Sequence, residues 1–209
     1  MLRLGLTGGI ATGKTAVAAM LREMGFAVID ADALAHKLIE PDQPAYGEVV
    51  REFGASILDT GNRVDRAKLA TIVFADPAKL ARLNAILHPP VETAIHQQFA
   101  EWSRNGARDA AFVEAALLVE AGYHKNLDGL VVTWSRPEQQ LERLRARGFS
   151  DEDARRRIAA QLPVAEKLSY ATEKIDCSGS LEATRAQVAA LAAKLRRPSK
   201  EVSSPEPIR

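Results

Sequence analysis

The chain has 209 residues, of which 46% are hydrophobic and 26% charged, so one compact domain with a sizeable core is expected. Its formal net charge of +1 gives no overall electrostatic attraction to nucleic acid or a membrane surface, and no apolar run is long enough to span a bilayer, so neither partner is expected. The single cysteine, Cys177, excludes an intramolecular disulfide and a thiolate metal cluster within one chain, and the N-terminus lacks the layout of a signal peptide, so we expect a cytoplasmic protein.

The first predicted elements are a short strand, a glycine-rich loop and a helix. Leu2–Thr7 is an apolar segment that leads into Gly8–Thr15, which fits the pattern Gly, four free positions, Gly-Lys-Ser/Thr. Behind the loop, apolar residues recur at helical spacing over 16–24. Loop glycines let backbone N–H groups point at an anion, Lys14 can reach the β- and γ-phosphates, and the Thr15 hydroxyl can ligate magnesium. This order predicts a nucleotide site rather than a turn with an incidental lysine.

A second strand is predicted at Phe26–Ile29, followed by a helix whose apolar stripe runs over 31–39. Asp30 is a good N-cap, and Asp32 lies in the first turn on the polar face that His36 shares. In a parallel sheet, the end of this strand opens on the same side as the glycine-rich loop. We therefore favour simple capping for Asp30 and single out Asp32 as the candidate for chemistry.

The segment from Pro41 to Gly106 is predicted to be helical, without a convincing strand. Amphipathic pieces run over Tyr46–Phe53, Arg66–Phe74, Pro77–Leu87 and Pro89–Trp102. The pair Pro89-Pro90 predicts a break between the last two helices, directly after His88. A structural histidine or helix cap is favoured there over a catalytic one. We expect a helical insertion, at about 36–106, that could hold a second substrate.

The remainder of the chain alternates strands with helices. Strands are predicted at Ala110–Ala115, within Leu127–Thr133 and at Lys174–Asp176, with helices from Pro137, at Phe149–Ala160 and at Leu181–Leu195. This alternation predicts an α/β fold with a mainly parallel sheet covered on both faces. The polar, proline-rich end, at about 197–209, is expected to be a disordered tail.

A phosphate-binding loop needs a partner that explains its use, and the size and lack of repeats favour a small-molecule kinase. Asp32 could then hydrogen-bond a substrate hydroxyl and accept its proton as the phosphoryl group is transferred. Its place at a helix N-terminus favours the ionised form, but a loose transition state requires mainly positioning and charge stabilisation. Two alternatives stay open: a kinase for another nucleotide or nucleoside, and a regulatory ATP- or GTP-dependent protein without a small-molecule acceptor.

Three further groups are candidates for the site. Arg143 and Arg147, at i,i+4, could supply positive charge to the phosphates from a lid, and a solvated helix face is the equally weighted alternative. Glu114 and Glu120 bracket the end of the third strand, where a carboxylate could hold magnesium through water, contact a substrate or simply face solvent. Cys177 is expected to be inert packing.

Several of these segments together resemble the dephospho-CoA kinase family. The resemblance runs in order from Leu4 to about Gly179. It rests on Leu6-Thr7-Gly8-Gly9-Ile10, Val28-Ile29-Asp30-Ala31-Asp32, Leu87-His88-Pro89, Leu117-Leu118-Val119-Glu120, and Arg143 to Arg147 followed by Gln161.

The resemblance implies both a fold and a reaction. The fold is a P-loop kinase core with a five-stranded parallel sheet flanked by helices, a helical CoA domain and a helical lid. The core would occupy about 1–35, 107–137 and 171–196, and the lid about 138–170. The reaction is transfer of the ATP γ-phosphate to the ribose 3′-hydroxyl of dephospho-CoA, giving CoA and ADP in the last step of CoA synthesis, with Mg²⁺ as cofactor. No obligate protein partner is inferred.

The family pattern also implies residue roles. The catalytic residues would be Asp32, Lys14, Arg143 and Arg147, with Thr15 on the metal. ATP would contact Gly9, Ile10, Ala11, Thr12, Gly13, Lys14, Thr15, Ala16 and Arg143. The acceptor would contact Thr7, Asp32, His88, Arg66, Leu117 and Gln161. Ala11 stands where the family usually has glycine, and Glu114 and Ala116 replace an aspartate and a proline.

Overall fold

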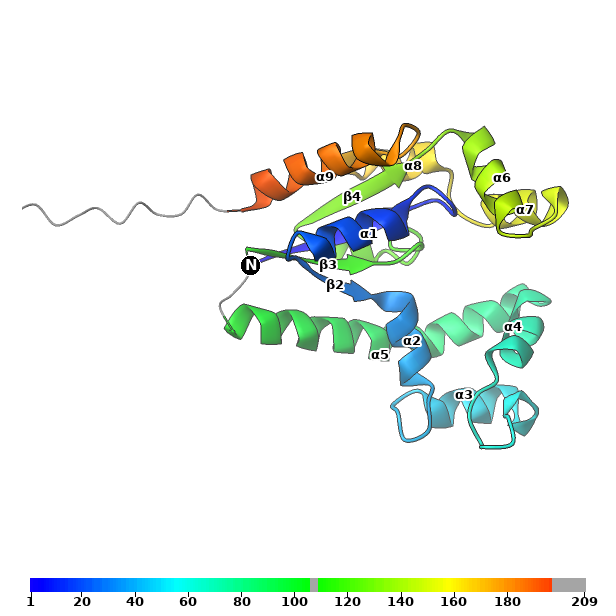
Figure 1. Cartoon of the computed structure of the whole chain (residues 1–209). Helices are drawn as coiled ribbons and strands as arrows, with labels where there is room; N and C mark the ends of the chain where they lie inside the picture. The colour runs from blue at the N-terminus through cyan, green and yellow to red at the C-terminus, as the bar shows by residue number, and fades with distance from the viewer. Residues whose placement is uncertain (106–108, 197–209) are drawn as a thin grey trace, which may run out of the picture.

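Five parallel strands form one sheet in the order β2-β3-β1-β4-β5 (Figure 1). The structure is a computed structural model of the chain and describes residues 1–105 and 109–196. The strands are β1 (Leu2–Gly8), β2 (Ala27–Asp30), β3 (Ala110–Glu114), β4 (Gly129–Trp134) and β5 (Glu173–Asp176). Because β1 is the central strand, the glycine-rich loop that follows it lies at the middle of the carboxyl-terminal edge of the sheet. The expected five-stranded parallel sheet is confirmed.

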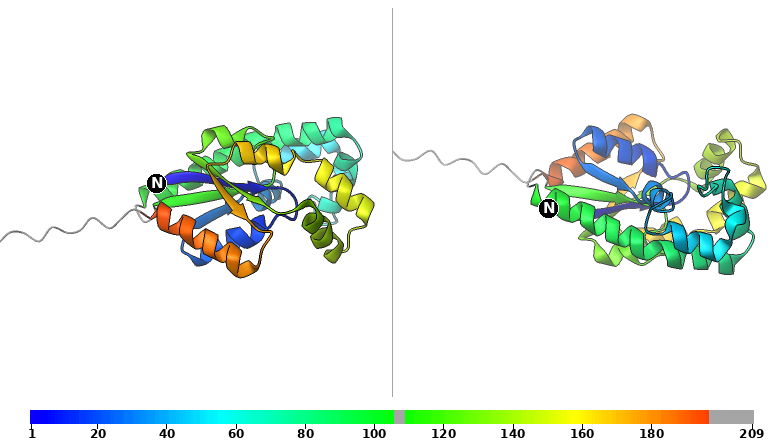
Figure 2. Two further views of the ribbon diagram at one scale, coloured as in Figure 1. Left: turned by 90° about the horizontal axis from the view of Figure 1, so that it is seen from above. Right: turned by 90° about the horizontal axis from the view of Figure 1, so that it is seen from below.

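Helices connect the strands and cover both faces of the sheet. They are α1 (Lys14–Glu23), α2 (Ala31–Leu38), α3 (Tyr46–Phe53), α4 (Arg66–Phe74), α5 (Pro77–Arg104), α6 (Pro137–Ala146), α7 (Asp151–Ala159), α8 (Val164–Ser169) and α9 (Leu181–Leu195), with 3₁₀ turns η1 (Ala55–Ile57) and η2 (Tyr123–Asn126). Figure 2 places α1 and α9 on the opposite side of the sheet from α5, with α6 and α7 beyond the carboxyl-terminal end of the strands.

Alternate residues of the central strands pack into two separate cores. Phe112 and Val131 face α1 and α9, whereas Val113 and Val132 face α5 and α8. Successive side chains of a strand point to opposite faces, so strands buried on both sides read as continuous apolar runs. This is why the sequence pattern locates the strands within one or two residues.

The helical segment after α2 has a core of its own. The ends of α2 and α5 close over α3, η1 and α4, with Val49 and Ile57 fully buried between them. Asp65 and Asp76 cap α4 and α5 by accepting backbone N–H bonds in the first turn of each helix. This part of the chain therefore forms a separate helical layer below the sheet in Figure 1.

The predicted break at Pro89-Pro90 is wrong, because α5 continues through both prolines. The prolines lack the N–H groups that would bond to the carbonyls four residues earlier. Burial holds the two halves in line: Ile86 packs in the helical layer, and Ile95 and Phe99 pack under the sheet. Tertiary packing thus overrides the local preference, and His88 lies inside a helix rather than at a helix end.

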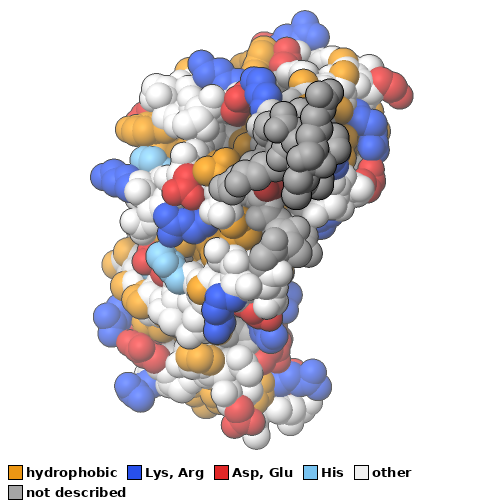
Figure 3. Space-filling model, turned by 90° about the vertical axis from the view of Figure 1, so that its left-hand side faces the viewer, with side chains coloured by type: hydrophobic (Ala, Val, Ile, Leu, Met, Phe, Trp, Pro, Cys, Tyr) orange, Lys and Arg blue, Asp and Glu red, His pale blue; other side chains and the backbone are white. Residues whose placement is uncertain are grey.

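The surface matches the small net charge. Figure 3 shows the face at the amino-terminal end of the strands, where basic and acidic side chains of the described residues are interspersed. Over residues 1–105 and 109–196, no helix is long and apolar enough to cross a membrane. The tail expected at 197–209 lies outside the described residues.

Candidate active site

The glycine-rich loop curls over the end of β1 and leads into α1. Gly13 has a φ of 100°, and a Cβ at this position would lie 2.8 Å from the Cys177 side chain, so both the backbone and the packing require glycine. The Thr12 hydroxyl donates to the Gly9 carbonyl at 2.8 Å and lies 2.9 Å from the Thr133 hydroxyl, which fastens the loop to β4. Glycine at position 13 and the bonds of Thr12 therefore fix the curve of the loop.

Ala11, at one of the free positions of the loop pattern, has a positive φ of 60°. A left-handed conformation costs an alanine about 1–2 kcal/mol. Its methyl group is buried in a small apolar cluster with Leu144 of α6 and Ala154 of α7. Packing against these helices compensates for the strained backbone.

Side chains from α6 and from the end of α7 grip the same loop. Gln140 donates to the Ile10 carbonyl at 2.7 Å, and the Gln161 Oε1 accepts the Ile10 N–H at 2.8 Å. Arg143 donates to the carbonyl of Ala11 at 3.0 Å and to that of Cys177 at 2.6 Å. Arg143 thus lies at the loop, as expected for an ATP contact. Gln161, which the resemblance implied for the acceptor, bonds to the loop backbone instead and does not line the cavity that contains Asp32, so its contact with a substrate stays a prediction.

Arg147 behaves differently from Arg143. It is exposed at the C-cap of α6, where its backbone N–H donates to the Leu144 carbonyl, but its side chain makes no hydrogen bond or ion pair with any residue that the structure describes. Its guanidinium is therefore free to approach a ligand, and its catalytic role stays a prediction.

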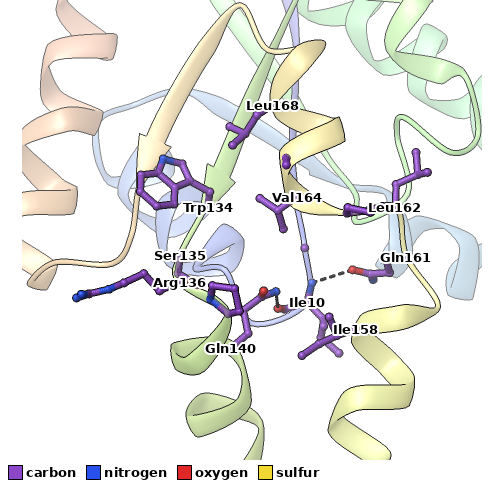
Figure 4. Close-up of a pocket in the computed structure, with 14 residues that line it drawn as sticks. Ile10, Trp134, Ser135, Arg136, Gln140, Ile158, Gln161, Leu162, Val164 and Leu168 are labelled. Atoms are coloured by element: carbon purple, nitrogen blue, oxygen red, sulfur yellow. Dashed lines mark hydrogen bonds between the residues drawn. The ribbon is translucent and has the colours of Figure 1, made fainter.

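A cavity of about 450 Å³ opens between the loop and α8. Figure 4 shows Trp134, Val164 and Leu168 along one side and the Gln140–Ile10–Gln161 contacts along the other. The buried Ser135 hydroxyl, which also lines it, has no hydrogen-bond partner within the described residues. The space beside the loop is thus mainly apolar, with one hydroxyl left to be satisfied.

Lys14 is paired with a buried carboxylate. Its Nζ lies 2.8 Å from Glu114 Oε1, and Arg22 approaches the other carboxylate oxygen at 3.6 Å. Glu114 is 4% exposed, so the solvent-facing interpretation that the sequence left open is wrong for this residue. The ammonium group of Lys14 is therefore held in an ion pair with Glu114 at the edge of the sheet.

Asp32, His88 and Leu117 line one cavity of about 160 Å³ between α2, α5 and the segment after β3. Three residues that the family pattern implied for the acceptor are thus brought together. Asp30, in contrast, accepts the Ala33 N–H at 2.9 Å, which confirms it as the N-cap of α2.

The structure places two other implied acceptor contacts elsewhere. Thr7 is fully buried, and its hydroxyl donates to the Ala116 carbonyl at 3.2 Å. This bond holds the backbone just before Leu117 in place. Arg66 is exposed at the first turn of α4 and does not line the Asp32 cavity. Contact of either residue with a substrate stays a prediction.

The sequence analysis missed Asn84 and Glu92, which line the Asp32 cavity beside His88. The three residues are spaced at i, i+4 and i+8 and so share one face of α5. The pattern is visible in the sequence only if the helix is allowed to run through Pro89-Pro90. The wrong break therefore hid this polar stripe.

The contacts of Glu120 and the burial of Cys177 indicate structural rather than chemical roles for both residues. Glu120 pairs with the fully buried Lys167 of α8 at 2.7 Å and accepts the Leu162 N–H at 3.0 Å. Burial raises the pKa of the Cys177 thiol to about 11, so at neutral pH it is protonated and unreactive. The structure therefore supports the interpretation of Cys177 as an inert packing residue.

Although Asp32 keeps an exposed surface, the protein around its carboxylate desolvates it and raises its pKa; Asp30 acts in the same direction, while Lys14 and His36 lower the pKa. We expect kcat/KM to fall as the carboxylate is protonated, with the acid limb above the range of an exposed aspartate. Because the folded pKa exceeds the unfolded one, the stability that Asp32 contributes is present at low pH and lost as pH rises through the folded pKa. Activity profiles between pH 4 and 8, with unfolding midpoints at each pH, test both signs. An acid limb below that of a free aspartate would contradict this.

The sheet is parallel, a phosphate-binding loop follows its central strand, an acidic residue follows the edge strand β2, and a two-helix segment contacts the loop. Together these features define a P-loop kinase. The sequence model described as dephospho-CoA kinase matches residues 2–183, so the chain belongs to the dephospho-CoA kinase family.

Individual relatives agree with this membership. A dephospho-CoA kinase of Symbiobacterium thermophilum is 47% identical over 188 residues, which cover 90% of this chain and 78% of the relative. The structure of TT1252 from Thermus thermophilus is similar, with a TM-score of 0.78, 36% identity and coverage of 94% of this chain and 98% of that one. The dephospho-CoA kinase of Campylobacter jejuni has a TM-score of 0.64, 25% identity and coverage of 92% and 96%.

Proposed function

We propose that this chain transfers the γ-phosphate of ATP to the ribose 3′-hydroxyl of dephospho-CoA, giving CoA and ADP as the final step of CoA synthesis. Family membership supports the reaction class. The observation that carries the site assignment is the position of Asp32, which lines a cavity with His88 and Leu117 and lies close enough to Lys14 of the loop for the ammonium group to act on its carboxylate.

The loop N–H groups and Lys14 would hold the β- and γ-phosphates, and Asp32 would orient the acceptor hydroxyl and accept its proton. Arg143 lies against the loop, and Arg147 is free to add positive charge to the transferring group. The remaining loop residues, with Ala16 at the start of α1, would line the triphosphate. The residues' main task is positioning, because the transition state itself requires little covalent chemistry.

The donor set at the start of α1 fits Mg²⁺. Thr15 is exposed in the first turn, and its hydroxyl has no hydrogen-bond partner among the described residues. A hydroxyl, phosphate oxygens and water are the hard ligands that this ion takes. When bound, Mg²⁺ would neutralise charge on the β- and γ-phosphates.

We assign the acceptor to the helical insertion at about 36–106 and the lid to about 138–170, with the core at about 1–35, 107–137 and 171–196. The separate apolar core of α3, α4 and the first half of α5 supports the insertion as a unit. The Ala11–Leu144–Ala154 cluster supports a lid that packs on the loop. A cytoplasmic location is proposed because a single buried thiol suits a reducing compartment.

An acceptor screen tests the proposal. Purified protein, ATP and Mg²⁺ would be incubated with dephospho-CoA, adenosine, AMP or shikimate, and ADP release would be measured with product masses. We expect ADP release in equal amount to CoA with dephospho-CoA, and background release with the others. A preference for another acceptor would favour the alternative nucleotide or nucleoside kinase. Slow hydrolysis that no acceptor changes would favour a regulatory protein.

A further inference from the structure

Lys14 and Glu114 form an ion pair at the carboxyl-terminal edge of the sheet. Lys14 is the loop residue expected to contact the phosphates, yet its Nζ is 2.8 Å from a carboxylate that is 4% exposed. Glu114 lies at the end of β3, opposite Leu6 of β1 and Asp30 of β2. The sheet therefore fixes the backbone of Glu114, whereas Lys14 carries its ammonium group on a long, flexible stem.

Removing Lys14 from this pair would leave a buried negative charge. Breaking a buried pair is strongly unfavourable when the remaining charge has no other partner. Arg22 of α1 offers such a partner, since its guanidinium lies 3.6 Å from Glu114 Oε2 and donates to the Val28 carbonyl at 3.3 Å. The present distance exceeds that of a hydrogen bond, so a small movement would convert this approach into a direct contact.

We propose that Glu114 is a positioning residue that competes with the nucleotide for Lys14, and that Arg22 takes over Glu114 when Lys14 turns to the phosphates. The inference rests on the proposed function in assuming that ATP is the loop ligand. Glu114 sets the nucleotide affinity because Lys14 must leave this ion pair before it can contact the phosphates. Arg22 lowers the free-energy cost of separating Lys14 from Glu114, because it pairs with the carboxylate that Lys14 leaves.

Two single variants are expected to shift affinity in opposite directions. Glu114→Gln frees Lys14 and should lower the Kd of MgATP roughly five-fold, whereas Arg22→Gln should raise it by a similar factor. Titration calorimetry without an acceptor measures both. Arg22→Lys should restore most of the affinity. The matched control is Arg185→Gln, which breaks the exposed Arg185–Glu23 pair beside α1 and should leave Kd unchanged.

The double variant Glu114→Gln/Arg22→Gln separates this exchange from general electrostatics. If Arg22 acts through Glu114, the double variant should bind as tightly as Glu114→Gln alone. Independent charge effects would instead add, and the double variant would return to the wild-type Kd. Additive values would overturn the proposal. Weaker binding in Glu114→Gln with a raised Mg²⁺ requirement would do so too, because it would make Glu114 a magnesium ligand.

A further variant keeps the proposal testable if Glu114→Gln does not fold, and the binding assay is separate from the test of the proposed function. If Glu114→Gln does not fold, Glu114→Asp shortens the side chain and should also lower Kd, and unchanged binding there would count against the proposal. The assay contains ATP alone, so its outcome is independent of the acceptor screen. Protein that shows the predicted Kd shifts but forms no CoA would refute the proposed function and retain this inference. CoA formation without the shifts would do the reverse.

Discussion

Asp32→Asn is expected to lower kcat by about 10²- to 10⁴-fold while leaving the Kd of ATP within about twofold. The amide retains the shape of the carboxylate and can still contact the acceptor hydroxyl, but it cannot accept the proton. Asp32 lines the cavity that we propose for the acceptor, and among the described residues its side chain makes no hydrogen bond to the loop. Nucleotide binding should therefore survive. Steady-state rates with dephospho-CoA, together with ATP titrations of the same preparation, measure the two quantities.

Asp30→Asn is the matched control for this experiment. Asparagine is as good an N-cap as aspartate, so α2 should keep its start and the rate should stay near that of the wild type. If Asp32→Asn turned over normally, or if Asp30→Asn lost as much rate, the assignment of the acceptor-side base would be wrong.

Lys167→Met is expected to destabilise the protein by roughly 1.5–3 kcal/mol, because the ammonium group no longer donates to Glu120 and to the Ala116 carbonyl beside α8. Lys167 is fully buried, 2.7 Å from Glu120 and 2.7 Å from the Ala116 carbonyl, whereas the Glu120 carboxylate that is left behind can be hydrated. For a chain of this length, the loss should lower Tm by roughly 3–12 °C. Thermal unfolding followed by circular dichroism measures it.

The exposed pair between Lys194 and Glu173 provides the comparison. The two groups are 3.1 Å apart, but the lysine side chain is 63% exposed, so Lys194→Met should cost at most about 1 kcal/mol. Equal shifts in Tm for the two variants would contradict the structural role that we give to Lys167.

The elements that the sequence predicted correctly are those set by local patterns. The loop and its flanking strand and helix, α3, α4 and α9 follow from periodicity and from glycine placement. The α8 helix was missed because it has only six residues and contains Lys167, which reads as a surface residue until its buried partners are known.

The site was predicted in part for the same reason. Asp32 follows directly from a strand end, so it could be singled out from the sequence alone. The Lys14–Glu114 pair joins residues 100 positions apart and depends on the register that places Leu6 opposite Glu114. The register between two strands cannot be predicted from the periodicity or spacing of residues along one strand. The partner of Glu114 could therefore not be predicted from the sequence.

The most direct test of the account is the placement of the acceptor in a crystal structure of the protein with Mg²⁺, a non-hydrolysable ATP analogue and dephospho-CoA. We predict that the ribose 3′-oxygen lies within about 3 Å of an Asp32 carboxylate oxygen, on the side facing the γ-phosphorus. A complex with both ligands in place, the 3′-oxygen beside the γ-phosphorus and Asp32 turned away from it, would contradict the account.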